Sequence, residues 1–244
     1  MFRSFMGYRL FAGLLVFCCC GFYGQTACGS IGNKTEGYIR DIGDGVKYGF
    51  EDPVWLIYAG GIGGLSRYDN DIRNRFAGKL LTGKLAHGAD IYGPGLNWLL
   101  GNTYILGEYL ASDRPKKEVK EYFKVYNEAY IVNMAFTYAL KTAVRRERPG
   151  KQNLRSFPSG HTSGSFAIAT VLYRIYGYEA GLPAYTLATI TCLQRIHADK
   201  HWLSDVLAGA LLGTLIGNGF AELIKENKNE KPDKKFVVGL SVAL

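Results

Sequence analysis

The stretch VLAGALLGTLIGNGF (Val206–Phe220) contains no charged residue and places glycine at positions 209, 213, 217 and 219. Glycine at every fourth position lies on one face of an α-helix, where the missing side chain lets another backbone approach closely. We therefore expect this stretch to form a central helix of a bundle. It falls short of the roughly 20 apolar residues that a membrane-spanning helix needs.

Helical patterns also dominate the chain before this stretch. Apolar periodicity predicts helices over 54–62, 68–85, 96–111, 116–147, 159–176, 182–196 and 202–224. Asp69 or Asn70 is expected to cap the second of these. Earlier in the chain, glycines predict turns that lead to Pro53: Gly29, Gly32, Gly37, Gly43 and Gly45. The fold class is all-α, a helical bundle of about six or more helices.

The two ends of the chain differ from this helical domain, which we place at 28–225. Arg3 and Arg9 precede an apolar stretch over 10–22 and a small-residue exit, which is the pattern of a signal peptide over 1–27. An uncleaved anchor is the alternative. Residues 226–244 are a charged connector and a tail whose alternate apolar residues, from Phe236 to Leu244, favour a short strand.

A signal peptide implies export to the bacterial periplasm or cell envelope. Cys28 follows Thr26 and Ala27 and faintly resembles a lipoprotein acceptor cysteine, but Gln25 does not fit that motif. Lipid anchoring at Cys28 is therefore the less favoured option.

The chain has a net charge of +8, a hydrophobic content of 48% and a mean hydropathy near zero. The hydropathy argues against a bundle of membrane spans. The basic residues form no regular stripe of the kind that binds nucleic acid, so no nucleic-acid partner is expected. The charge suits an anionic substrate or peripheral contact with a membrane surface, and solubility is the alternative explanation.

Three groups of residues between Lys141 and Asp205 could together handle a phosphate. In the first group, Lys141 and Arg148 are seven residues apart and should project from one face of the same helix. Pro149 then ends the helix and leaves Arg148 where a ligand can reach it. Alone, the pair is also typical of a basic helix end.

The second group, Pro158-Ser159-Gly160-His161, opens the next predicted helix. Free backbone N–H groups at a helix N-terminus favour an anion, and Ser159 can cap the helix and donate its hydroxyl to a phosphate oxygen. Gly160 lets a ligand approach the backbone. Alone, these residues also fit a capped helix with an incidental histidine.

The third group contains Arg195, His201 and Asp205. His201 and Asp205 are four residues apart, so one imidazole nitrogen can donate to the carboxylate while the other stays free to attack. Arg195 can bind two phosphate oxygens at once. Alone, this group also fits a surface His–Asp pair.

In this order, the three groups resemble the signature of the type-2 phosphatidic acid phosphatase (PAP2) superfamily, in particular its bacterial acid and lipid phosphatases. That signature is a lysine, six residues and Arg-Pro; Pro-Ser-Gly-His; and Ser-Arg, five residues, His, three residues and Asp. Every part occurs here except the serine before Arg195, which is Gln194. The resemblance covers roughly residues 38–225.

The resemblance implies a phosphoric ester hydrolase that needs no metal or other cofactor. His201 would attack phosphorus and form a phosphohistidine, Asp205 would orient it, and His161 would protonate the leaving oxygen and then activate water. The phosphate-binding residues would be Lys141, Arg148, Ser159, Gly160 and Arg195.

Two other functions remain open at this point. Vanadate can occupy the same cage in vanadium-dependent haloperoxidases of this superfamily, although the chain is short for that group. A non-catalytic anion-binding envelope protein is the second alternative, but binding alone requires neither a nucleophile nor an acid. The substrate would be a phosphorylated compound, with a lipid among the candidates. Four aromatic residues could line a groove for a lipid tail, although core packing is their commoner use: Tyr92, Trp98, Tyr104 and Trp202.

Overall fold

A computed structural model describes residues 31–81, 83–84, 86–87 and 94–227. The helices are α2 (Ile31–Phe50), α3 (Trp55–Leu65), η1 (Ser66–Tyr68), α4 (Asp69–Phe76), α6 (Pro94–Ala111), α7 (Lys116–Val144), α8 (Gly160–Tyr176), α9 (Tyr178–His197) and α10 (Leu203–Asn227). The all-α prediction is confirmed. The predicted signal peptide, Cys28, Tyr92 and the tail strand lie outside the described residues.

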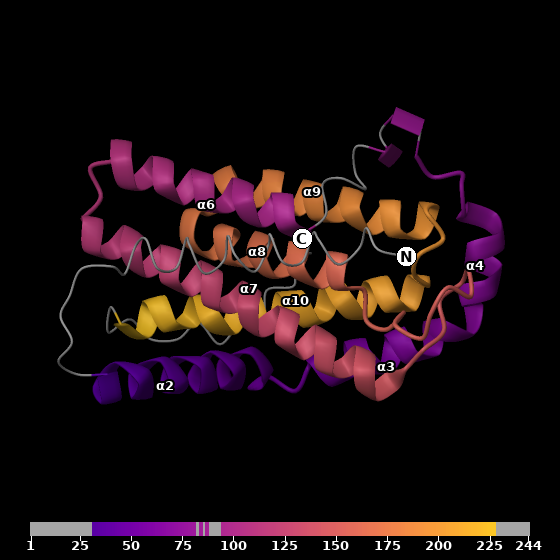
Figure 1. The fold of residues 1–244 in the computed structure, drawn as a ribbon, viewed down its shortest axis with the longest axis horizontal. Coiled ribbons are helices and arrows are strands. Elements are labelled where there is room, and N and C mark those ends of the chain that lie inside the picture. The colour runs from indigo at the N-terminus through magenta and orange to yellow at the C-terminus, as the bar shows by residue number, and fades with distance from the viewer. Residues whose placement is uncertain (1–30, 82, 85, 88–93, 228–244) are drawn as a thin grey trace, which may run out of the picture. The chain divides into compact units, whose positions relative to one another are not determined.

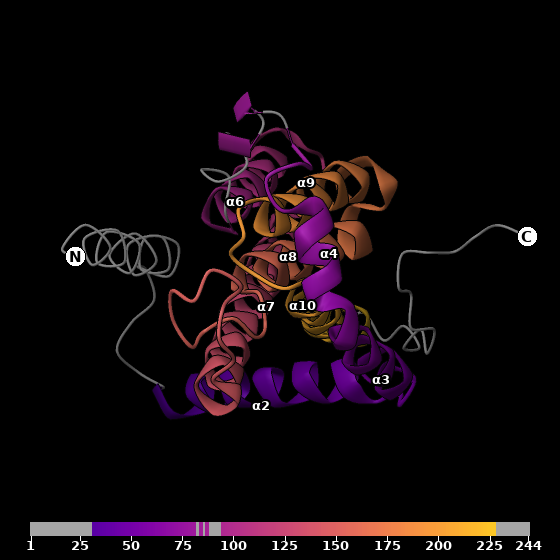
Figure 2. The same ribbon diagram turned by 90° about the vertical axis from the view of Figure 1, so that its right-hand side faces the viewer.

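The chain divides into two compact units, Met1–Ile39 and Arg40–Leu244, and both the bundle and the site lie in the second. Within it, α8 is the central helix, because it packs against α6, α7, α9 and α10 (Figures 1 and 2). The signature residues Gly160 and His161 thus begin the helix at the centre of the bundle.

Glycines let α10 lie directly against α8. A Cβ atom on Gly213 would collide with the Ser163 carbonyl oxygen of α8. Cβ atoms on Gly209 and Gly217, one turn to either side, would collide with the Ser159 and Ala167 carbonyl oxygens. The prediction that this glycine face permits a close helix–helix approach is confirmed. The stretch Leu203–Lys225 is long and apolar enough to cross a membrane, and 72% of its most apolar window is buried in the bundle.

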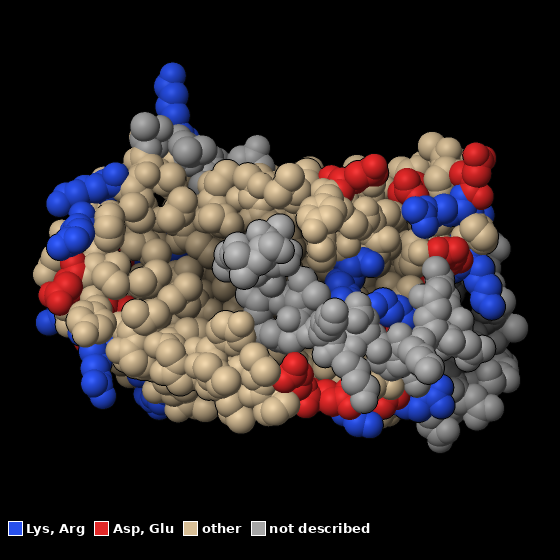
Figure 3. Space-filling model, turned by 180° about the vertical axis from the view of Figure 1, so that it is seen from behind, with Lys and Arg blue, Asp and Glu red and all other residues tan. Residues whose placement is uncertain are grey.

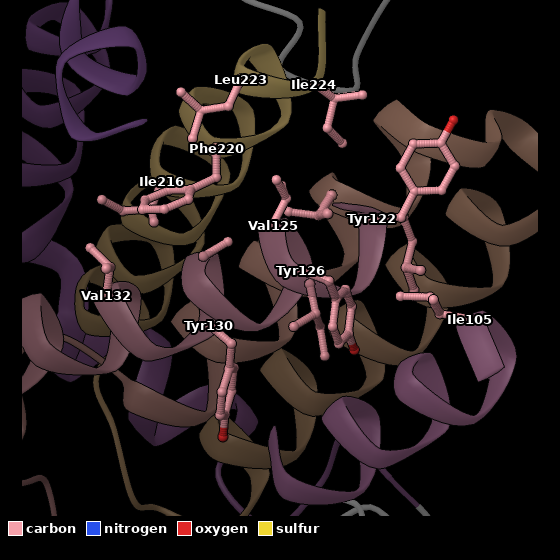
Figure 4. Packing of buried hydrophobic residues seen from close by; sticks show 14 of the residues in the cluster. Ile105, Tyr122, Val125, Tyr126, Tyr130, Val132, Ile216, Phe220, Leu223 and Ile224 are labelled. Atoms are coloured by element: carbon pink, nitrogen blue, oxygen red, sulfur yellow. The ribbon is translucent and has the colours of Figure 1, made fainter. Parts of the chain in front are cut away.

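The apolar core lies between α7 and α10 (Figure 4). Tyr126 of α7 and Phe220 of α10 are fully buried there. Trp98 of α6 is also part of this core, and its indole N–H donates to Asn127 at 2.8 Å. Trp98 therefore packs the core.

The structure differs from the predicted turns near the N-terminal end. Residues 31–50 form helix α2, and Gly45 and Gly49 lie against Phe220 and the Leu215 carbonyl of α10. These glycines serve close helix packing, so the prediction of turns at 32, 37, 43 and 45 was wrong. Glycine suits both a turn and a close contact between helices, and only the position of the partner helix distinguishes these two roles.

Two predicted helices end earlier than expected. The helix predicted over 68–85 stops at Phe76, and Gly78 then adopts a left-handed φ of 73°. The helix predicted to reach residue 147 stops at Val144, because Arg145 takes a left-handed φ of 50° at its C-terminus. The second difference changes the site, since it frees the loop 145–159 from the helix.

Candidate active site

The early end of α7 moves Arg148 off the helix that carries Lys141. Arg148 lies in the following loop, where its backbone N–H and its Nε atom both donate to Asn153 at 3.1 Å. The expectation that Lys141 and Arg148 project from one face of a single helix is therefore wrong. They nevertheless remain electrostatic neighbours, as the pKa of Lys141 shows.

Lys141 lies in the last turn of α7 and points into the loop that precedes α8. Its Nζ atom donates to the Arg155 carbonyl at 2.9 Å and also to the Pro158 carbonyl. A Cβ atom on Gly160 would lie 3.7 Å from Lys141 Cε, so the lysine reaches the start of α8. Burial, together with the positive charge of Arg148, lowers the pKa of Lys141 to about 8.

His201 is buried just before α10, and the loop before α8 fixes its tautomer. Its Nδ1 atom lies 2.7 Å from the Ser156 carbonyl oxygen. A carbonyl oxygen can only accept a hydrogen bond, so Nδ1 carries the proton and Nε2 keeps a free lone pair. Burial lowers the pKa of His201 to about 4, with Lys141 and Arg148 acting in the same direction. The ring is therefore neutral and nucleophilic at neutral pH.

Asp205 lies beside His201 but is not its nearest partner. The distance from His201 Nδ1 to Asp205 Oδ2 is 3.9 Å, longer than the contact with Ser156. Asp205 Oδ2 instead accepts from the Trp202 backbone N–H at 3.0 Å and from the Ser156 hydroxyl. The expected direct hydrogen bond from His201 to Asp205 is thus absent. Ser156 links the two residues, because its carbonyl accepts from His201 and its hydroxyl donates to Asp205.

The Asp205 carboxylate is fully buried and ionised. Burial by itself would raise the pKa of Asp205, but neighbouring His201, the Ser156 hydroxyl and the Arg146 guanidinium together hold it below its usual value. A fixed negative charge 3.9 Å from the imidazole would favour the positively charged ring that a nucleophilic histidine becomes.

Arg146 and Asp69 complete this arrangement, and the sequence did not reveal either of them as site residues. Arg146 donates to Asp205 Oδ1 at 2.8 Å and to Asp69 Oδ2 at 2.7 Å. Asp69 also accepts from the Ser204 backbone N–H at 3.0 Å. The expectation that Asp69 or Asn70 caps the helix is wrong, because Tyr68 occupies the cap position and the Asp69 carboxylate binds the start of α10.

Trp202 adds an aromatic contact to this group. Its ring lies 5.5 Å from the Arg146 guanidinium and 5.9 Å from that of Arg73, within the range of a cation–π interaction. Its indole N–H donates to the Glu147 carbonyl at 2.8 Å. Trp202 therefore holds the loop 145–159 against α4 and α10.

The start of α8 offers backbone donors near these cations. Ser159 occupies the cap position with an extended backbone, and its N–H donates to the Asp205 carbonyl at 2.9 Å. Its side chain makes no capping bond and is fully buried, where it accepts from Thr162 at 3.0 Å. His161 is partly exposed in the first turn. The first N–H groups of α8 lack partners within the helix and can bind an anion.

Arg195 lies in the last turn of α9 and is only 5% exposed. Its Nε atom donates to Gln194, the residue that replaces the signature serine. Its backbone carbonyl accepts from the Lys200 N–H at 3.1 Å in the loop that leads to His201. The Gln194 side chain thus contacts Arg195, the residue that is predicted to bind phosphate.

The arrangement combines a neutral imidazole, a buried carboxylate, two neighbouring cations and a helix N-terminus. Such a set can support attack on phosphorus while the cations hold the negative charge of the oxygens. No group of three or more His, Cys, Asp or Glu side chains in the described part of the chain is arranged to hold a metal ion.

Fold and site together describe a helical bundle whose grouped side chains are suited to phosphoryl transfer. Residues 123–229 match the model of the PAP2 superfamily. This part of the chain is similar to that superfamily.

Two curated relatives are similar over part of this region. The lipid A 1-phosphatase of Porphyromonas gingivalis is 41% identical over 80 residues, which cover 32% of this chain and 18% of that protein. The lipid A 4'-phosphatase of Helicobacter pylori is 34% identical over 105 residues, which cover 42% of this chain and 51% of that protein. The matches thus span at most about half the length of these relatives.

Two crystal structures are similar to the fold. The transmembrane PAP2-type phosphatidylglycerolphosphate phosphatase of Bacillus subtilis has a TM-score of 0.50 and 19% identity, covering 72% of this chain and 92% of that one. LpxE of Aquifex aeolicus has a TM-score of 0.44 and 25% identity, covering 62% and 90%. The first of these supports the fold alone.

Proposed function

We propose that this protein is a phosphatase that releases phosphate from lipid-linked phosphate monoesters or pyrophosphates through a phosphohistidine at His201. The observation that carries the proposal is the state of His201. Its Nδ1 proton is held by the Ser156 carbonyl and its pKa is lowered to about 4, so Nε2 is available to attack at neutral pH.

In the first step, the Nε2 lone pair of His201 forms a bond to phosphorus and the bond from phosphorus to the leaving oxygen breaks. His161 gives its proton to that oxygen. The imidazole now carries a positive charge, which the Asp205 carboxylate stabilises from 3.9 Å. Arg146 keeps this carboxylate ionised and in place.

In the second step, water attacks the phosphohistidine and the phosphorus–nitrogen bond breaks. His161 takes the proton from water and is ready for another cycle. Lys141, Arg148 and Arg195, with the N–H groups at the start of α8, hold the phosphate oxygens through both steps. A bound phosphate raises the pKa of Lys141, because it places negative charge beside the ammonium group.

A lipid substrate is supported by the named activities of the two curated relatives, which act on lipid A. The surface of the bundle supports it independently. Helix α3 has no charged and no buried residue, and the side chain of Ile57 in it is 74% exposed. Leu110 at the end of α6 is 72% exposed and Leu182 of α9 is 64% exposed.

These exposed apolar residues fit contact with a membrane. Figure 3 shows one face of the molecule, on which a broad uncharged area separates charged side chains at one edge from those toward the other side. Exposed apolar residues that gather on a surface commonly bind lipid or another protein. A lipid surface is the partner that also presents the substrate.

Export completes the proposal. The N-terminal pattern over 1–27 would deliver the protein to the periplasm or cell envelope, and cleavage after Ala27 would place Cys28 first in the mature chain. Mass determination of the purified mature protein tests both cleavage and lipidation. A mature chain that still begins at Met1 would contradict the signal peptide.

The activity is tested by phosphate release in the presence of a metal chelator. The substrates should include a lipid phosphate, a polyprenyl pyrophosphate and a soluble monoester. We expect His201→Ala to lower the rate by at least about 10⁴-fold and His161→Ala by about 10²–10⁴-fold. His87→Ala, at an exposed histidine outside the site, is the control and should retain full activity.

Full activity in His201→Ala would overturn the proposal. Phosphate binding without turnover in the unaltered protein would support the anion-binding alternative. Halide oxidation with added vanadate, without phosphate release, would support the haloperoxidase alternative.

A further inference from the structure

An apolar groove runs along α8 between α6 and α9, and the mechanism above makes no use of it. Its volume is about 200 Å³. Asn97 and Ser165, joined by a hydrogen bond of 2.9 Å, form its polar end. Aliphatic side chains continue the lining, among them Leu100, Ile168 and Leu187.

The position of the groove relates it to the site. Ser165 follows His161 by four residues on α8, which is about one helical turn or 6 Å along the axis. The lining continues along the same helix to Leu172, about 10 Å further from the phosphate site. The groove therefore begins beside the expected acid and leads away from it.

The charge of the lining favours one orientation of a ligand in the groove. Among the described residues that line the groove, Glu179 is the charged one, and it lies beyond the C-terminal end of α8, far from His161. Its carboxylate would repel a phosphate at that end. An anionic headgroup is thus favoured at the His161 end, where the cations are, and the apolar part of the ligand is favoured in the groove.

The groove also adjoins the exposed apolar surface proposed to contact the membrane. Leu100 and Tyr104 of α6 line it and are themselves more than 40% exposed. Across the groove, Leu182 of α9 is exposed next to the lining residue Pro183. An apolar chain could therefore enter from the side without leaving an apolar environment.

We propose that this groove binds one acyl chain of the phosphorylated lipid while its phosphate lies at His201. The inference rests on the proposed phosphatase function. A volume of about 200 Å³ is below the roughly 300–1,000 Å³ of a pocket that encloses a whole ligand, so the groove holds part of one chain. Tyr104, one of the four aromatic residues that the sequence offered for a lipid-tail groove, lines this groove.

The test fills the groove and compares two substrates. Ala184 of α9 lines the groove, and Ala184→Phe should obstruct it. Displacing even two methylene groups into water lowers affinity about tenfold, so we expect kcat/KM for a micellar lipid phosphate with long acyl chains to fall at least tenfold. The kcat/KM for the lipid divided by the kcat/KM for a short, soluble monoester should fall by the same factor.

Thr186→Phe is the matched control, because it adds the same ring two residues away at an exposed position of α9. It should leave the ratio unchanged. Ala180→Phe, at a second lining position one turn before Ala184, should reproduce the effect of Ala184→Phe. Using the ratio separates obstruction from misfolding, since misfolding lowers turnover of both substrates.

An unchanged ratio in both groove variants would overturn the inference, and so would hydrolysis of soluble monoesters with no turnover of the lipid by the unaltered protein. Absence of phosphate release from every substrate would instead contradict the proposed function itself. The two failures are therefore distinguishable.

Discussion

At the scale of single residues, the nucleophilicity of His201 depends on where one proton lies. The Ser156 carbonyl fixes the Nδ1 proton of His201, and burial keeps the ring neutral. The signature reveals His201 and Asp205 through their spacing. It does not reveal Ser156, because a backbone carbonyl acts through its position and can belong to any residue type.

The pKa values lead to a prediction about pH. His201 must be unprotonated to attack, so kcat/KM should fall as the pH drops through about 4. Lys141 must be protonated to bind phosphate, so kcat/KM should fall again as the pH rises through about 8. A pH profile with a soluble monoester measures both limbs.

Lys141→Arg provides the control for the alkaline limb. Arginine stays protonated across this range, so this variant should lose the decline near pH 8 even if its rate is lower. An unchanged alkaline limb in Lys141→Arg would show that another group is responsible.

Arg146 gives a second prediction at this scale. Arg146→Met would leave the buried carboxylates of Asp69 and Asp205 without their shared cation. We expect a loss of about 2 kcal/mol in the free energy of unfolding, less than for a fully buried pair because Arg146 is 28% exposed, and a fall in kcat with little change in KM.

Arg145→Met is the matched control, since Arg145 is the exposed neighbour of the same type. Denaturant unfolding and steady-state kinetics measure both effects. Equal behaviour of the two variants would contradict a positioning role for Arg146. The sequence could not distinguish these arginines, because the partners of Arg146 lie 77 and 59 residues away.

At the scale of elements, the helices were largely predictable from apolar periodicity, and their packing was predictable where glycine recurs every four residues. The predicted stretches 96–111 and 159–176 match α6 and α8 to within two residues. Helix α2 was missed, because its glycines resemble turn residues until their contact with α10 is known. The end of α7 was missed because its left-handed residue is an arginine and not a glycine.

The contact between α8 and α10 gives the prediction for this scale. Gly213→Ala would press a Cβ atom into the Ser163 carbonyl and the Ala167 backbone N–H. We expect a destabilisation of about 1–3 kcal/mol by thermal or denaturant unfolding, with reduced activity because α8 carries His161.

Gly107→Ala is the control, because no atom lies within 4 Å of its added Cβ on the exposed side of α6. That change should stabilise the protein by up to about 1 kcal/mol, since alanine favours a helix interior. A Gly213→Ala protein as stable as the unaltered one would contradict the close approach.

At the scale of the whole molecule, the mean hydropathy near zero averages over two different parts. Charged residues, including those of the site, lower the mean hydropathy. The exposed apolar residues of α3, α6 and α9 raise it. An average over the chain could not show that these apolar residues lie on the surface. The proposed membrane contact therefore depends on which apolar residues the fold leaves exposed.

Membrane contact is measured by co-sedimentation with vesicles of neutral phospholipid. Ile57→Glu and Leu110→Glu should each lower the bound fraction, because a charge on an apolar surface opposes burial in lipid. Asn74→Glu adds the same charge at an exposed polar position and should leave binding unchanged. Equal binding by all three variants would contradict the proposed surface.

The central claim is that His201 is the nucleophile, and trapping the phosphoenzyme tests it most directly. His161→Ala removes the group that activates water, so rapid acid-free quenching of this variant with an activated monoester should yield a phosphorylated protein. Peptide mapping should place the phosphate on His201, and the double variant His161→Ala, His201→Ala should carry none. Phosphate on another residue, or equal labelling without His201, would contradict the account.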